Sequence, residues 1–274
     1  GRTIRRLPVP AAIVTEPRPK LAVGADGRYA VLGRDERGRL LLYLLSSTGE
    51  IWRAHEVLSG DRVDAFDGPS LEQRGQIAAA DGTTVVRAPA GHESVVLDRS
   101  GARLASLQLP PDTFDALPVP GGEIVLRRGL QRGVATVIER IGADGTARWS
   151  TETSGGATAW PGLAATGGRL AVVVDGGREI EHLDMASGDH VTRQEHDEGV
   201  TDVAGGPHGI LYLLRREHNV VEVLRLDRGT LGRGTLLTLG SQTLDGTPIA
   251  MSAAGDGRFA VAHRGAADDG RLTS

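Results

Sequence analysis

Short apolar runs separated by small glycine-containing turns repeat along the 274-residue chain. Six of these runs follow glycines that recur about once every 46 residues: Gly27, Gly82, Gly122, Gly168, Gly209 and Gly257. The apolar runs are four to eight residues long and do not show the i, i+3, i+4 spacing of a helix. The pattern therefore predicts β-strands along nearly the whole chain.

Each period contains room for four strands, and residues 21–58 show the pattern best. A second glycine lies 19 to 23 residues after the first in five periods, at Gly49, Gly101, Gly145, Gly188 and Gly229. Antiparallel strands in a repeat of this length are typical of a propeller. We expect an all-β fold, a six-bladed β-propeller with about four antiparallel strands per blade, forming a single domain over residues 1–274.

The two ends of the chain fit closure of such a ring. Residues 249–264 provide only two strands of a sixth blade, and residues 266–274 are a tail or the start of an incomplete strand. Residues 1–18 are apolar enough to supply the closing strand of this last blade. Closure would remove the unpaired strand edges of an open β array.

One segment carries a family resemblance. Residues 35–53, DERGRLLLYLLSSTGEIWR, resemble a repeat of the quinoprotein-like (PQQ-type repeat) β-propellers, whose blades read Asp-Gly, an apolar strand, Thr-Gly and a strand bearing tryptophan. Trp52 follows Gly49 by three residues, and Trp149 follows Gly145 by four. The resemblance implies a propeller in which both tryptophans pack between blades. It does not imply the quinone cofactor, because many proteins with such repeats bind none.

A second family is also similar. The glycine pairs at 121–122 and 167–168 resemble those of kelch propellers, which is the second choice. There is no Trp-Asp dipeptide of the kind that marks WD40 repeats.

Composition narrows the function classes. The chain has no cysteine, which excludes disulfides and thiolate metal sites, and its net charge of −4 argues against a nucleic-acid binder. No apolar run reaches the roughly 18 residues that span a bilayer. The acidic segments 61–67 and 195–198 lack the spacing of a calcium loop, so neither a metal nor a cofactor is expected.

All 31 basic residues except Lys20 are arginine, which we interpret as the codon bias of a GC-rich, bacterial and specifically actinobacterial genome.

The longer connections are expected on one face of the propeller. They join the second and third strands of each blade, or successive blades, and we call this side the loop-rich face. Its inter-blade loops are expected at 59–75, 109–115, 154–162, 196–201 and 240–248. Loops on a rigid β scaffold commonly carry binding groups, so we expect function there.

Basic residues recur where the second strands reach this face. They lie five to seven residues after the first glycine of a blade: Arg34, Arg87, Arg127, Arg128, Arg215, Arg216 and Arg264. The fourth blade has Asp175 instead. Such a rim would focus positive potential on an anion, although solvated arginines in an arginine-rich protein give the same pattern. Trp160, in a glycine-rich loop, is either a stacking platform for a partner or a cap on a blade junction.

Two functions follow as hypotheses. The first is a monomeric, non-catalytic binding module, extracytoplasmic or on the cell surface although a cytoplasmic location is not excluded, that holds a partner protein or an anionic ligand through Arg34, Arg87, Arg128, Arg216, Arg264 and Trp160. The alternative is a lyase, hydrolase or cyclase at the mouth of a central channel. There His263, His218 and His92 would be the acid or base, and Arg216 or Arg264 would stabilise negative charge.

Overall fold

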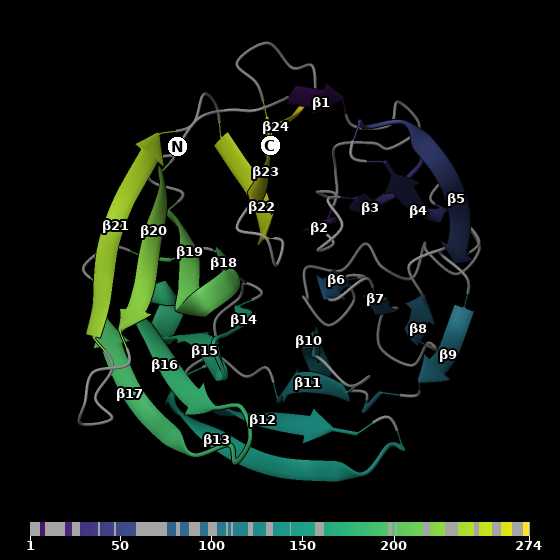
Figure 1. Cartoon of the computed structure of the whole chain (residues 1–274). Helices are drawn as coiled ribbons and strands as arrows, with labels where there is room; N and C mark the ends of the chain where they lie inside the picture. Colours follow the sequence, from purple (N-terminus) through teal and green to yellow (C-terminus); the bar gives the residue numbers. More distant parts are fainter. Residues whose placement is uncertain are drawn as a thin grey trace.

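The structure is a computed structural model, and Figure 1 shows its course. It describes residues 6–8, 20–23, 28–37, 39–46, 48–58, 76–80, 83–87, 94–97, 103–107, 109–110, 112–119, 123–129, 134–142, 144–156, 162–196, 199–200, 202–215, 220–227, 235–243, 247–253, 259–264 and 271–273. Within these ranges no helix is long and apolar enough to cross a membrane.

The described strands form six antiparallel sheets of four strands each. The first sheet contains β2 (Lys20–Val23), β3 (Tyr29–Arg34), β4 (Leu40–Leu45) and β5 (Ile51–Leu58), and the second contains β6 (Gln76–Ala80), β7 (Thr83–Arg87), β8 (Ser94–Leu97) and β9 (Arg103–Leu107). The third contains β10 (Thr113–Val119), β11 (Glu123–Arg128), β12 (Ala135–Ile141) and β13 (Ala147–Gly156), and the fourth contains β14 (Leu163–Thr166), β15 (Arg169–Val174), β16 (Glu179–Asp184) and β17 (His190–Glu195).

The last two sheets complete the set. The fifth contains β18 (Asp202–Gly205), β19 (Ile210–Arg215), β20 (Val220–Asp227) and β21 (Thr235–Thr243). The sixth contains β22 (Thr247–Ala253), β23 (Phe259–Arg264), β24 (Arg271–Thr273) and β1 (Arg6–Pro8), and β1 pairs antiparallel with β24. Two short 3-10 turns, η3 (Asp175–Gly177) and η4 (Pro207–Gly209), lie in the fourth and fifth sheets.

Glycine turns join the strands, as the repeat predicts. Gly168 and Gly209, between the first and second strands of their sheets, have φ values of 78° and 83°. Gly49, Gly145 and Gly188, between third and fourth strands, have φ values of 85°, 79° and 80°. Side chains are disfavoured at these left-handed positions, so the recurring glycines mark the turns that need them.

The sheets follow one another around a common centre, with the first strand of each sheet innermost (Figure 1). The innermost strands contact each other in sequence, β2 with β6, β6 with β10, β10 with β14, β14 with β18, β18 with β22, and β22 with β2. The fourth strands, β5, β9, β13, β17 and β21, lie at the perimeter.

Hydrogen bonds between sheets show that neighbouring first strands run in the same direction. Near two strand starts, Gly162 N donates to Asp115 Oδ2 over 3.0 Å. Near two strand ends, Thr166 Oγ1 donates to the carbonyl of Gly206 over 2.6 Å. Because starts meet starts and ends meet ends, the second strands of these sheets also end on one face.

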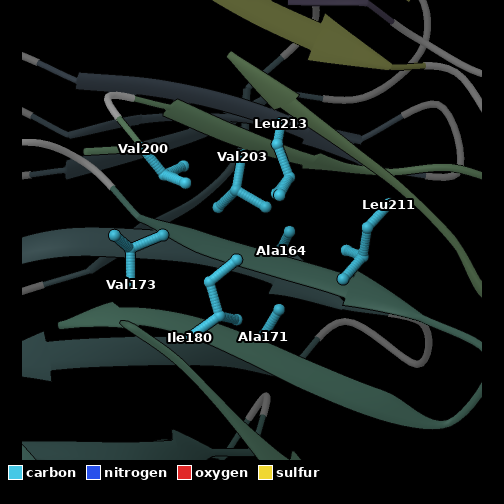
Figure 2. Packing of buried hydrophobic residues seen from close by; sticks show 8 residues of the cluster. All are labelled: Ala164, Ala171, Val173, Ile180, Val200, Val203, Leu211 and Leu213. Atoms are coloured by element: carbon cyan, nitrogen blue, oxygen red, sulfur yellow. The ribbon is translucent and has the colours of Figure 1, made fainter. Parts of the chain in front are cut away.

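Apolar side chains fill the space between sheets. The cluster in Figure 2 joins the fourth and fifth sheets through Ala164, Ala171, Val173, Ile180, Val200, Val203, Leu211 and Leu213. A second cluster, which includes Val172 and Leu183, joins the fourth sheet to the third, and Trp149 packs against it. Trp149 Nε1 donates to the carbonyl of Met185 over 3.0 Å, so this tryptophan packs between sheets as expected. The side chain of Trp52 lies outside the described part.

The all-β fold and its antiparallel sheets are confirmed, but three of the expected loops were drawn too long. Strand β10 starts at Thr113 within the expected loop 109–115, and β21 ends at Thr243 within 240–248. Strand β13 continues to Gly156 within 154–162, because Glu181 of the next sheet accepts hydrogen bonds from the backbone N–H groups of Ser154 and Gly155.

Candidate functional site

Five of the six second strands end on an arginine. The last residues of β3, β7, β11, β19 and β23 are Arg34, Arg87, Arg128, Arg215 and Arg264. In the fourth sheet β15 ends at Val174, and Asp175 follows. Arginine thus stands at the end of the second strand in every sheet except the fourth, where Asp175 takes its place.

Arg128 combines exposure with internal ion pairs. About a third of its side chain (32%) is exposed, and its guanidinium lies 3.0 Å from both Asp112 Oδ1 and Glu139 Oε2. The hydrogen bonds that Arg128 donates to these two carboxylates raise its pKa. A ligand at this position would meet a cation already shared with two acids, so Arg128 would orient an anion rather than supply a full free charge.

Arg127 does not belong to the rim, although the spacing placed it there. Its side chain is fully buried, its Nη1 donates to the carbonyl of Val173 over 2.7 Å, and its Nε donates to Thr136 Oγ1 over 3.1 Å. Burial lowers its pKa to about 10, against the opposite effect of Asp115 and Glu181. The side chains of consecutive strand residues point to opposite sides, so two adjacent arginines cannot share one surface.

Arg215 reaches the neighbouring fourth sheet. Its Nη2 lies 3.3 Å from Nδ1 of His196, which is 9% exposed and follows β17 directly. Arg215 therefore links the fifth sheet to the fourth sheet where its own strand ends.

A polar cluster replaces the arginine in the fourth sheet. Asp175 has a φ of 49°, and its Oδ1 accepts a 2.7 Å hydrogen bond from the N–H of Gly156. Arg193 forms ion pairs with Asp175 and with Glu179. Burial raises the pKa of Glu179, Arg193 lowers it, and the hydrogen bond with Asp175 raises it.

This cluster was not foreseen from the sequence. Asp175 was noted only as an exception in the arginine pattern, and its partner Arg193 lies 18 residues further along the chain. One feature of the sequence could have indicated the cluster, namely the charged residues at the ends of neighbouring strands. Glu179 at the start of β16 is paired with Glu195 at the end of β17.

The remaining candidates are placed only in part. Arg34, Arg87 and Arg264 are placed by their backbone at strand ends, and His263 precedes Arg264 in β23, opposite Pro248 of β22. Four further candidates lie outside the described residues: Arg216, His218, His92 and Trp160. In the part of the chain that is described, no group of three or more acidic or histidine side chains is arranged to hold a metal ion.

Several solved structures of known proteins have a fold similar to that of this chain. The sequence matches no protein-family model, and no curated protein matches it significantly. A chain of the mitotic checkpoint complex is similar over 99% of this chain and 93% of its own length, with a TM-score of 0.62 and 14% identity. Virginiamycin B lyase from Staphylococcus aureus is similar over 98% of this chain and 85% of its own, with a TM-score of 0.59 and 16% identity.

A third structure names the architecture. The β-propeller domain of Cps50 (Swd1) from Myceliophteria thermophila is similar over 99% of this chain and 98% of its own, with a TM-score of 0.59 and 10% identity. At such low identity these likenesses show the fold and not an activity. The chain thus has a fold of the β-propeller class.

Proposed function

We propose that this chain is a closed, six-bladed β-propeller that acts as a non-catalytic binding module and holds an anionic ligand, or an acidic segment of a partner protein, on its loop-rich face. The observation that carries the proposal is the arginine at the end of five of the six second strands. Closure is supported by the pairing of β1 with β24 and by contacts between β22 and β2.

The positions of these arginines support a shared role. Three of them are paired with the first residue of an innermost strand, in the pairs Arg128–Thr113, Arg87–Gln76 and Arg264–Thr247. Positive groups arranged around a common centre add their potentials there, and guanidinium groups bind carboxylates and phosphates well. Arg216 and Trp160 belong to this proposal as a further cation and a stacking surface. A monomer exported to the cell surface remains part of the hypothesis.

A matched pair of charge reversals tests the proposal. The variant Arg34→Glu/Arg264→Glu changes the ends of β3 and β23 at the loop-rich face. The control Arg28→Glu/Arg258→Glu changes the residues that precede the same two strands, at their opposite ends. Binding of tripolyphosphate and of an oligoglutamate peptide is measured by calorimetry at low ionic strength.

The rim variant should weaken binding about tenfold or more, and added salt should reduce the difference, because contacts between exposed charges are screened. The control should bind within about twofold of the unchanged chain, since its two substituted positions precede β3 and β23 instead of standing at their ends. Equal losses in both variants would mean that only net charge matters, and would refute the rim.

An enzyme is the second candidate, favoured by structural neighbours that are lyases, among them virginiamycin B lyase and a streptogramin B lyase. In this reading His263, His218 and His92 would act as acid or base, with Arg216 or Arg264 stabilising negative charge. Incubation with virginiamycin B discriminates the two readings. Turnover that disappears in His263→Asn supports the enzyme, and absence of turnover favours the binding module.

A further inference from the structure

His182 lies in the middle of β16 with only 1% of its side chain exposed. Side chains along a strand alternate between its two faces. Ile180 belongs to the apolar cluster between the fourth and fifth sheets (Figure 2), whereas Glu181 contacts Ser154 of the third sheet. His182 therefore shares the side of Ile180 and lies between the fourth and fifth sheets.

Within the part of the chain that the structure describes, neither ring nitrogen of the His182 imidazole has a hydrogen-bond partner. A positive charge on Arg169 of β15, or on His196 after β17 once that ring is protonated, disfavours a proton on the His182 ring. Burial is the larger effect, and together they lower the pKa of His182 from 6.5 to about 4. A protonated ring at this position would be a buried cation without a partner.

The carboxylates near the contact between the fourth and fifth sheets bind groups other than the His182 ring. Asp184 accepts hydrogen bonds from Arg169 and from the N–H groups of Ala186 and Ser187. Asp202 of β18 accepts from the N–H of Met251 in the sixth sheet. The acids Glu179 and Glu181 lie on the side of β16 that faces the third sheet. On β19, the charged residue is Arg215, another cation.

A hydrogen bond from Arg215 favours the neutral form of a second histidine in the same contact. Arg215 can only donate hydrogen bonds, so Nδ1 of His196, 3.3 Å from Arg215 Nη2, must accept. A proton on that nitrogen would replace the hydrogen bond by repulsion between two cations. The contact between the fourth and fifth sheets thus contains His182, whose neutral form burial favours, and His196, whose neutral form the hydrogen bond from Arg215 favours.

We propose that His182 and His196 make the contact between the fourth and fifth sheets an acid-sensitive joint, which opens locally when the imidazoles gain protons while the contact between the third and fourth sheets stays closed. The sign follows from linkage. Because the pKa of His182 is lower in the closed state than when exposed, closure is fully stable above pH 6.5 and weakens as pH falls toward 4.

Single cysteines report the opening, because the chain has none of its own. Ala171→Cys places a thiol in the cluster that faces the fifth sheet, at a position 1% exposed. Val172→Cys is the matched control, since the next residue along β15 is 0% exposed and faces the third sheet. Labelling rates with dithiodipyridine, which reacts with thiols in acid, are measured at pH 7 and pH 5 and divided by the rates of a short cysteine peptide.

The relative labelling rate at Ala171→Cys should rise about twentyfold from pH 7 to pH 5, the change expected when a pKa of about 4 in the closed state becomes 6.5 in the open state. The rate at Val172→Cys should change less than about twofold, because its contact does not involve these histidines. Adding His182→Leu should remove this twentyfold rise at Ala171→Cys and leave only the part that His196 contributes.

Three results would overturn the joint. Equal rises at both cysteines would show global acid unfolding, and no rise at Ala171→Cys would show that the contact stays closed. An unchanged rise in the His182→Leu background would show that another group triggers opening. The comparison between Ala171→Cys and Val172→Cys does not need the His182→Leu variant. The test therefore remains valid even if His182→Leu does not fold.

Discussion

Arg127 and Arg128 are neighbours in sequence and have opposite roles in the fold. Arg127 is fully buried and bonds to the carbonyl of Val173 in the next sheet. Arg128 is about a third exposed and pairs with acids of its own sheet. The difference follows from strand alternation, which sends consecutive side chains to opposite sides.

Removing the buried charge should be far more costly than removing the exposed one. Arg127→Met leaves Asp115 and Glu181 buried without the cation that faces them, which should lower the free energy of unfolding by about 3–5 kcal/mol. The matched variant Arg128→Met should lower it by no more than about 1 kcal/mol, because its ion pairs are partly solvated.

Urea unfolding of the two variants at neutral pH checks this prediction. If Arg128→Met were as destabilising as Arg127→Met, the buried ion network between the third and fourth sheets would not be the stronger contribution.

The sequence could indicate that one of the two adjacent arginines faces inward, but not which one. The acid that faces Arg127 from the fourth sheet, Glu181, lies 54 residues further along the chain. Long-range partners of this kind leave no local pattern. The Asp175–Arg193–Glu179 cluster was missed for the same reason.

At the scale of elements, turns were easier to predict than strand ends. Glycines at positive φ, such as Gly168 and Gly188, are required by local backbone geometry, so their spacing is visible in the sequence. The end of β13 was not visible, because hydrogen bonds from Ser154 and Gly155 to Glu181 of another sheet hold it.

Strand β1 should contribute to stability out of proportion to its length of three residues. Its pairing partner β24 is equally short and would become an edge strand without it. Deletion of residues 1–16 should therefore lower the thermal midpoint by about 3–5 °C, which for a chain of this size corresponds to about 2–3 kcal/mol.

Scanning calorimetry of the deletion variant measures the effect. The substitution Arg6→Ala, which keeps the backbone of β1 in place, serves as the control and should change the midpoint little. An unchanged midpoint after the deletion would remove the case for ring closure by the N-terminal strand.

For the whole molecule, the sequence pattern correctly predicted an all-β chain of antiparallel sheets, because turn chemistry and apolar runs are local features. Six closed blades remain a prediction. Arginines lie at the ends of β3, β7, β11 and β23, where the spacing predicts them, and their role as a rim stays a prediction. Whether His92, His218 and His263 lie close together could not be predicted, since the answer depends on loop conformations that the spacing of residues does not specify.

The most direct test of the binding face is a hydrogen-exchange footprint of the unchanged chain with and without tripolyphosphate at low ionic strength. The rim account predicts slower exchange in the connections that follow the second strands, including residues 35–39, 175–178 and 216–219. The turns on the opposite face, residues 46–50, 142–146 and 184–189, should exchange at unchanged rates. Protection confined to those turns, or no protection anywhere, would contradict an anion-binding rim on the loop-rich face.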